Sequence, residues 1–243
     1  MNANRVFAAA AGLSAAILTT GCFPAVSLTG SAISGTGNPV TREFDFTDFD
    51  KVRAGSAFQV EIEQGDRYEV TVTVDENIEP YLDVAQSGDT VRIGLKPGTW
   101  LRNATLRATV LMPALAAVDL SGATRGSLGG FSSGDRCSFA ASGASTLRGT
   151  IDCGDVTVNA SGASTIELAG EAGDLEVEAS GASRAVLGDF RAEDVRVNAN
   201  GASRIEVYAS GRLTGEASGA STVQSVGKPA STNVRTSGAS SVR

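Results

Sequence analysis

Three aspartates occupy equivalent positions in the second half of the chain. Asp155, Asp174 and Asp194 each stand seven residues before the glycine of a repeated segment close to Ser-Gly-Ala-Ser, and Arg212 holds that position in the next copy. If the copies stack like neighbouring strands, these carboxylates lie about 4.8 Å apart, close enough to bind Ca²⁺ together or to raise one another's pKa. The column is therefore a candidate cation site. The structural alternative, which we favour, is that these aspartates form Asx turns at the starts of strands.

The same column offers the only feature of the sequence that suits catalysis. The chain contains no histidine, which excludes Ser-His-Asp and Cys-His mechanisms and removes the commonest metal ligand. Polysaccharide lyases and hydrolases with β-helical folds use surface carboxylates with Arg or Lys, so a carbohydrate-active enzyme is the alternative function. No aromatic platform for a sugar accompanies the aspartates, because the single tryptophan, Trp100, lies outside the repeats. We therefore expect no enzyme, no cofactor and no dedicated metal centre.

Two cysteines lie among the repeats. Cys137 stands six residues before its glycine, in a column that we expect to face inward, whereas Cys153 stands nine residues before the next glycine, at a predicted corner. A disulfide needs Cα atoms within about 7 Å, which this offset along the register makes awkward. We therefore favour two separate thiols. A bridge is the alternative if the protein is exported to an oxidising compartment.

The N-terminus has the pattern of an export signal. One basic residue, Arg5, precedes an uncharged apolar stretch from Val6 to Leu18, which is shorter than the roughly 20 apolar residues of a membrane-spanning helix. The segment from Leu18 to Cys22 then resembles a bacterial lipobox, in which the cysteine becomes the lipidated first residue. We predict a signal peptide over 1–21, lipidation of Cys22, and a flexible Ser/Thr/Gly-rich tether within 22–43. Cleavage without lipidation, followed by secretion, is the alternative.

The repeated segment selects the architecture. The intervals between its glycines are 21, 19, 19, 20, 18 and 19 residues. Between the copies, apolar and polar residues alternate with the period of a β-strand, and about 19 residues leave no room for a crossover helix. We therefore predict an all-β, single-stranded parallel β-helix with about seven coils. Its corner glycines are Gly122, Gly143, Gly162, Gly181, Gly201, Gly219 and Gly238.

Each copy of the repeat supplies residues that we expect to face the core and residues that we expect to form a corner between strands. Leu175, Val177 and Ala179 illustrate the apolar positions six, four and two residues before a glycine, and Ile166 illustrates the position four residues after one. We assign the glycines to corners because a tight bend requires positive φ or close backbone approach. The hydroxyl two residues after each glycine, as in Ser164, is expected to hydrogen-bond along the stack. A ligand-binding row of serines is the less favoured alternative.

The sequence pattern of residues 44–120 predicts longer strands that lack the tight repeat. Apolar and polar residues alternate over 58–62 and 70–74 around a turn at 64–66, which predicts a hairpin. Further strands are expected near 91–95 and 106–112. We expect this region to form wider first coils and to cap the solenoid, whose end would otherwise expose a strand edge.

Several segments together resemble a known family. They are Phe44–Phe49, Gly55-Ser56, Val60–Gly65, Val91–Ile93, Met112–Leu115 and the Ser-Gly-Ala-Ser series. This combination resembles the DUF2807 family, also called the "putative auto-transporter adhesin head GIN domain", over residues 44–243. The resemblance implies a bacterial envelope protein with a β-helical fold and no established catalytic residues.

We therefore predict one β-helical domain over 44–243, with N-terminal coils in 44–120 and repeat coils in 121–243. The net charge of −7, without a basic cluster, argues against nucleic acid as a partner. The expected function is that of a non-enzymatic lipoprotein of the bacterial envelope, facing the periplasm or the exterior, with a binding, adhesive or structural role. Its expected partners are the membrane, through the lipid, and a surface glycan or an envelope protein.

Overall fold

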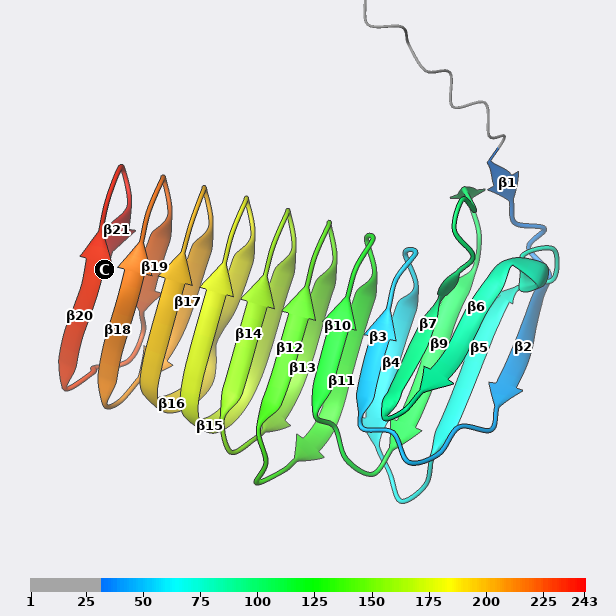
Figure 1. Ribbon diagram of the computed structural model, residues 1–243, viewed down its shortest axis with the longest axis horizontal. Helices are drawn as coiled ribbons and strands as arrows, with labels where there is room; N and C mark the ends of the chain where they lie inside the picture. Colours follow the sequence, from blue (N-terminus) through cyan, green and yellow to red (C-terminus); the bar gives the residue numbers. More distant parts are fainter. Residues whose placement is uncertain (1–31) are drawn as a thin grey trace, which may run out of the picture. The chain divides into compact units, whose positions relative to one another are not determined.

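The alternating pattern of the repeats produces a β-solenoid. The computed structural model describes residues 32–243, which form about six turns of about 20-residue coils (Figure 1). The predicted all-β solenoid is confirmed, and no α-helix occurs within 32–243. The seven corners expected from the sequence enclose six complete turns. The predicted signal peptide and Cys22 lie outside the described residues.

Two parallel sheets run along the repeat region. Equivalent residues of successive coils pair directly, as Val156 does with Leu175 and Ile166 with Ala185. The first sheet contains β10 (Ala117–Leu120), β12 (Cys137–Ala141), β14 (Val156–Ala160), the second halves of β15 (Thr165–Ala179) and β16 (Arg184–Ala199), β18 (Arg212–Ala217) and β20 (Ser231–Thr236). The second sheet contains β11 (Arg125–Ser132), β13 (Thr146–Asp152), the first halves of β15 and β16, β17 (Arg204–Ala209), β19 (Thr222–Ser225) and β21 (Ser241–Val242).

The core lies between these two sheets. Val158, Val177 and Val197 are stacked in register on one side, and each is at most 1% exposed. Burying such side chains stabilises the fold by roughly 1.5–3 kcal/mol each relative to leaving them in water. In the last coil, which pairs with only one neighbour among residues 32–243, Thr232 and Thr236 take the inward positions and are exposed. Small polar residues thus replace the apolar column where that column ends.

The seven corner glycines bring the backbones of successive coils together. Their φ angles lie between 62° and 75°, a left-handed region that residues with a Cβ atom adopt at a cost. At five of these corners, the alanine after the glycine donates its N–H to the glycine carbonyl of the preceding coil, as in Ala182 to Gly162 at 2.7 Å. A Cβ atom added to Gly181 would lie 2.7 Å from that same carbonyl oxygen. Both the conformation and the contact therefore require glycine.

The hydroxyls two residues after these glycines satisfy carbonyl groups inside the stack. Ser164 donates to the carbonyl of Ala141 at 2.9 Å, and Ser183 donates to that of Ala160 at 2.9 Å. Both serines are at most 2% exposed. Because a buried polar group without a partner is costly, these bonds make the serines part of the scaffold.

The N-terminal region caps one end of the solenoid, as expected. Its coil of β3 (Lys51–Ala54) and β4 (Gln59–Gln64) lies between the coil of β10 and β11 and an outer coil of β7 (Thr90–Leu95) and β9 (Leu106–Met112) (Figure 1). Three strands then cover the outer coil in antiparallel fashion: β2 (Pro39–Phe44), β5 (Glu69–Asp75) and β6 (Leu82–Ser87). A 3-10 turn, η1 (Glu79–Tyr81), connects β5 to β6.

Two expectations for this region were wrong. The hairpin over 58–74 does not form, because β9 lies between β4 and β5 and pairs with both. The folded unit begins at Ala32 rather than at residue 44. Part of the expected tether is instead strand, since β1 (Ile33–Ser34) pairs with β8 (Leu101–Arg102) and β2 pairs with β5.

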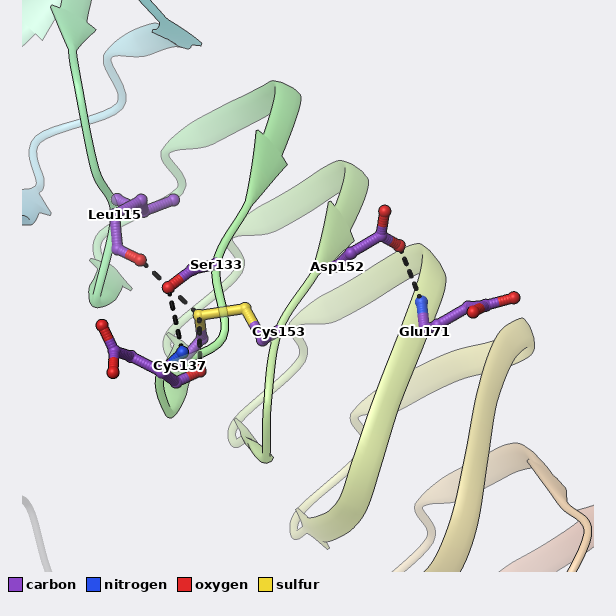
Figure 2. The surroundings of a disulfide bond; sticks show 7 residues. Leu115, Ser133, Cys137, Asp152, Cys153 and Glu171 are labelled. Atoms are coloured by element: carbon purple, nitrogen blue, oxygen red, sulfur yellow. Dashed lines mark hydrogen bonds between the residues drawn. A yellow bond between two sulfur atoms is a disulfide. The ribbon is translucent and has the colours of Figure 1, made fainter.

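Cys137 and Cys153 form a disulfide between successive coils (Figure 2). The preference for two separate thiols was therefore wrong. Cys137 donates its backbone N–H to Asp155, and Gly154 donates to Asp135, so the corner after β13 folds over the start of β12. This bend brings the two Cα atoms to 6.2 Å, within the range that a disulfide spans, despite their offset along the strands.

We expect Gly181→Val to destabilise the solenoid by more than about 1 kcal/mol, since it forces a β-branched residue into a positive-φ corner against a carbonyl. Arg196→Ala, an exposed position on the adjacent strand, is the control and should cost less than about 0.5 kcal/mol. Urea unfolding followed by circular dichroism measures both. Equal destabilisation by the two variants would contradict the assignment of corners and outward positions.

Candidate functional site

The outward side of the first sheet presents two continuous rows of polar residues. We call this surface, over β14, β15, β16, β18 and β20, the polar face. It exists because alternate residues of each strand point away from the core and because the parallel register stacks equivalent residues. The middle row is Thr157, Glu176, Arg196, Thr214 and Asn233. The second row is Asn159, Glu178, Asn198, Glu216 and Arg235.

Two open grooves follow these rows. One, of about 380 Å³, runs beside the column of Asp155, and the other, of about 530 Å³, extends towards Arg235. The two grooves share Glu176, Arg196 and Thr214, so they are neighbouring parts of one surface. The surface is hollowed only slightly and suits an extended ligand better than a small molecule enclosed on all sides.

The charged side chains of the two rows take no part in hydrogen bonds or ion pairs within 32–243. No hydrogen bond or ion pair within 32–243 engages the side chains of Glu176, Glu178, Arg196, Glu216 and Arg235. Some other outward charges are paired, as in Arg148 with Glu167 on the second sheet, whereas Arg184 and Arg204 of that sheet form no ion pair within 32–243. The polar face therefore has carboxylates and guanidinium groups free to contact a partner.

The aspartate column borders this face and has a structural role. Asp155 accepts a hydrogen bond from the Arg136 guanidinium at 3.1 Å and another from the backbone N–H of Asp174 at 3.2 Å. Asp194 likewise accepts from the side chain of Arg212 at 3.0 Å and from its backbone N–H at 2.8 Å. Asp155 and Asp194 thus bond to the next coil instead of forming the favoured Asx turns.

These contacts decide the charge state of the column. Hydrogen bonds from the Arg136 side chain and from the Asp174 backbone lower the pKa of Asp155 below its ordinary value. The Arg212 side chain and backbone lower the pKa of Asp194 in the same way. The suggestion of a raised pKa was wrong for these two residues, because arginines and backbone amides, rather than carboxylates, are their immediate partners.

The geometry gives little support to a metal site or to acid catalysis. Within 32–243, no three acidic, Cys or His side chains are placed to hold a metal ion. A general acid needs a carboxyl group that stays protonated near neutral pH, and the resolved carboxyl pKa shifts at this face are downward. Asp155 and Asp194 therefore do not supply such a protonated carboxyl group.

Comparison with known families agrees with the fold. Residues 48–229 match the sequence model of DUF2807, described as "Putative auto-transporter adhesin, head GIN domain". The chain belongs to this family. The resemblance predicted from the sequence is thereby confirmed, and an adhesin-like family is consistent with a place in the envelope or at the cell surface.

Solved structures show the same fold as this GIN-domain protein at low sequence identity. A "putative adhesin" from Bacteroides fragilis superimposes with a TM-score of 0.80 at 18% identity, covering 87% of this chain and 99% of its own. A "putative lipid binding protein" from Parabacteroides distasonis has a TM-score of 0.70 at 19% identity, covering 87% and 98%. A "putative adhesin" from Parabacteroides merdae has a TM-score of 0.64 at 17% identity, with the same coverage. No curated protein sequence matches significantly.

The rows of this surface can be located in the sequence, although Glu178, Glu216 and Arg235 were not singled out from it. The middle row follows from counting five residues back from each glycine. Glu178, Glu216 and Arg235 stand three residues before their glycines, so the same count would have found them. Arg136 was also missed, although it stands seven residues before Gly143 in the aspartate column.

We expect Asp194→Asn to lower the melting temperature at neutral pH and to have no effect in strong acid. Because folding lowers the pKa of Asp194, its contribution to stability is present above the ordinary Asp pKa of about 3.9 and is lost as pH falls through the folded-state value. Calorimetric melting temperatures across this range test the prediction. Asp174→Asn, whose carboxylate has no ion pair within 32–243, is the control and should change less. A difference for Asp194→Asn that persists unchanged in acid would contradict the proposed ion pair.

Proposed function

We propose that this protein is a non-enzymatic envelope lipoprotein that adheres to an extended polar partner through its polar face. The observation that carries this proposal is the set of charged side chains in the two rows, which are exposed or half-buried and have no partner within 32–243. Membership of an adhesin family and the fold shared with proteins named as adhesins support a binding role.

The chemistry of the face indicates its ligand class. Carboxylates, guanidinium groups, amides and hydroxyls alternate along the rows with the spacing of stacked strands, about 4.8 Å. Such a surface offers many hydrogen bonds but little apolar area, so each contact is weak. The matching partner is an extended chain with its own hydroxyls or mixed charges, either a surface glycan or a segment of an envelope protein. Many anchored copies on one membrane would multiply these contacts through avidity.

Anchoring through Cys22 completes the proposal. None of the helical segments within 32–243 has the length and apolar character needed to cross a bilayer. The lipobox-like segment ending at Cys22 is the sequence feature that supports a covalent lipid. A single acyl chain holds a protein only marginally, whereas two or more chains on one residue give stable attachment.

The anchor is tested by Cys22→Ala in the full chain expressed in a bacterium that processes lipoproteins. The variant should lack the acyl mass and move from the membrane fraction to the soluble fraction, whereas the parent should carry that mass and sediment with membranes. Immunoblots of the fractions and mass spectrometry report both properties. A parent protein that is wholly soluble and unacylated would contradict the anchor.

The binding face is tested by reversing one charge on each side of the solenoid. Arg196→Glu alters the polar face, and Arg204→Glu makes the same change at an exposed position of the second sheet. An array of envelope glycans and whole envelope fractions serves as the probe. We expect Arg196→Glu to weaken binding by about tenfold, the effect of losing roughly 1.4 kcal/mol, and Arg204→Glu to leave it unchanged.

Equal binding by both variants would exclude the polar face. Turnover of a polysaccharide by the parent protein, lost in an Asp155, Asp174 and Asp194 triple Ala variant that remains folded, would instead establish the carbohydrate-active enzyme.

A further inference from the structure

The capped end of the solenoid carries an exposed aromatic pair. Trp100 is 62% exposed and is the single tryptophan of the chain, and Tyr81 is 37% exposed. They account for two of the three large apolar side chains that are exposed within 32–243. The backbone segments that carry them lie near one another, because Lys96 donates its backbone N–H to Tyr81 at 2.9 Å and Thr99 donates to Lys96 at 3.2 Å. Trp100 follows that turn directly and does not line either groove of the polar face.

This pair lies where the N-terminal segment joins the folded unit. Ile33 donates its backbone N–H to the carbonyl of Trp100 at 2.8 Å, and β1 pairs with β8 immediately afterwards. In Figure 1, β1 is at the end of the solenoid opposite the C-terminus. Eleven residue intervals separate Cys22 from Ile33. Even fully extended, that length of chain spans at most about 40 Å, and a flexible chain of that length spans about 20 Å on average.

The charges around Trp100 suit a lipid surface. Lys96 and Arg102 flank it in sequence, are exposed, and form no ion pair within 32–243. Among the residues that the structure describes, the Lys96 ammonium group donates only to the carbonyl of Pro80, at 2.7 Å. Tryptophan and tyrosine are enriched at the boundary between headgroups and acyl chains, where one end of the ring is apolar and the other meets water. Exposed basic residues beside them attract anionic headgroups.

We propose that the segment Lys96–Arg102 is a membrane-contact loop. Trp100 lies in the interfacial layer of the bilayer that holds the lipid on Cys22, with Tyr81 beside it and with Lys96 and Arg102 towards the headgroups. This inference rests on the proposed lipid anchor. It adds a second, weaker attachment that fixes which end of the solenoid faces the membrane and leaves the polar face free of the bilayer.

The test uses the acylated full chain reconstituted into vesicles of phosphatidylcholine with phosphatidylglycerol. Because Trp100 is the single tryptophan, the emission spectrum reports this residue alone. We expect the emission maximum to shift to shorter wavelength relative to the soluble Cys22→Ala chain. We also expect loss of intensity when the lipids carry bromine near the headgroup end of their acyl chains. Vesicle flotation and the acyl mass are measured on the same sample.

A matched control moves the tryptophan to the other end of the solenoid. Val226, which is 51% exposed, is replaced by Trp in a Trp100→Phe background, and this reporter should be neither shifted nor quenched. Equal quenching of both reporters would overturn the assignment of the contact to this loop.

The remaining outcomes separate this inference from the anchor. A protein that is acylated and floats with the vesicles but emits as in water, unquenched, would overturn the membrane-contact loop and leave the anchor intact. A protein that carries no acyl group and does not float would overturn both.

Discussion

The structure depends on one hydrogen bond, repeated at five successive corners of the stack. The amide that follows a corner glycine donates to the carbonyl of the corner glycine in the preceding coil, at 2.7 Å for Ala163, Ala182 and Ala220. The backbones approach so closely that no Cβ atom fits between them. Because this contact fixes each coil on the last without slippage, the residues before and after the corner stay in register. That register aligns equivalent residues of successive coils, including the buried serine hydroxyls, the apolar columns and the outward rows.

The same register determines what the surface can do. A row of equivalent positions becomes a line of side chains, so the sequence is free to vary outward residues without disturbing the core. Near the corners, outward positions hold Asp194 and Arg212, whose hydrogen bonds join one coil to the next. Along the middle of the first sheet, Glu176 and Arg196 have no partners within 32–243. That difference distinguishes the aspartate column, which joins coils, from the polar face, which we propose as the binding surface.

The sequence was sufficient for the repeats and insufficient for contacts outside them. The glycine period and the alternating residues determine the corners and columns, because each coil meets only its neighbours. The N-terminal cap could not be read in the same way, since β9 separates β4 from β5 through pairing that is distant in sequence. The Cys137–Cys153 bridge was the less favoured alternative because counting residues along the repeat takes no account of the bend at Gly154. The ion pair of Asp155 depends on Arg136, which counting along one column would have revealed.

Amide hydrogen exchange at a single corner tests the central role of this hydrogen bond most directly. The N–H of Ala182 donates to Gly162, whereas that of the adjacent Gly181 has no backbone acceptor within 32–243. Both residues are exposed to solvent, so burial alone predicts similar rates. We expect Ala182 to be strongly protected and Gly181 to exchange quickly, with the same contrast at Ala163 beside Gly162. Rapid exchange of both amides at both corners would contradict a stack held in register by its corner glycines.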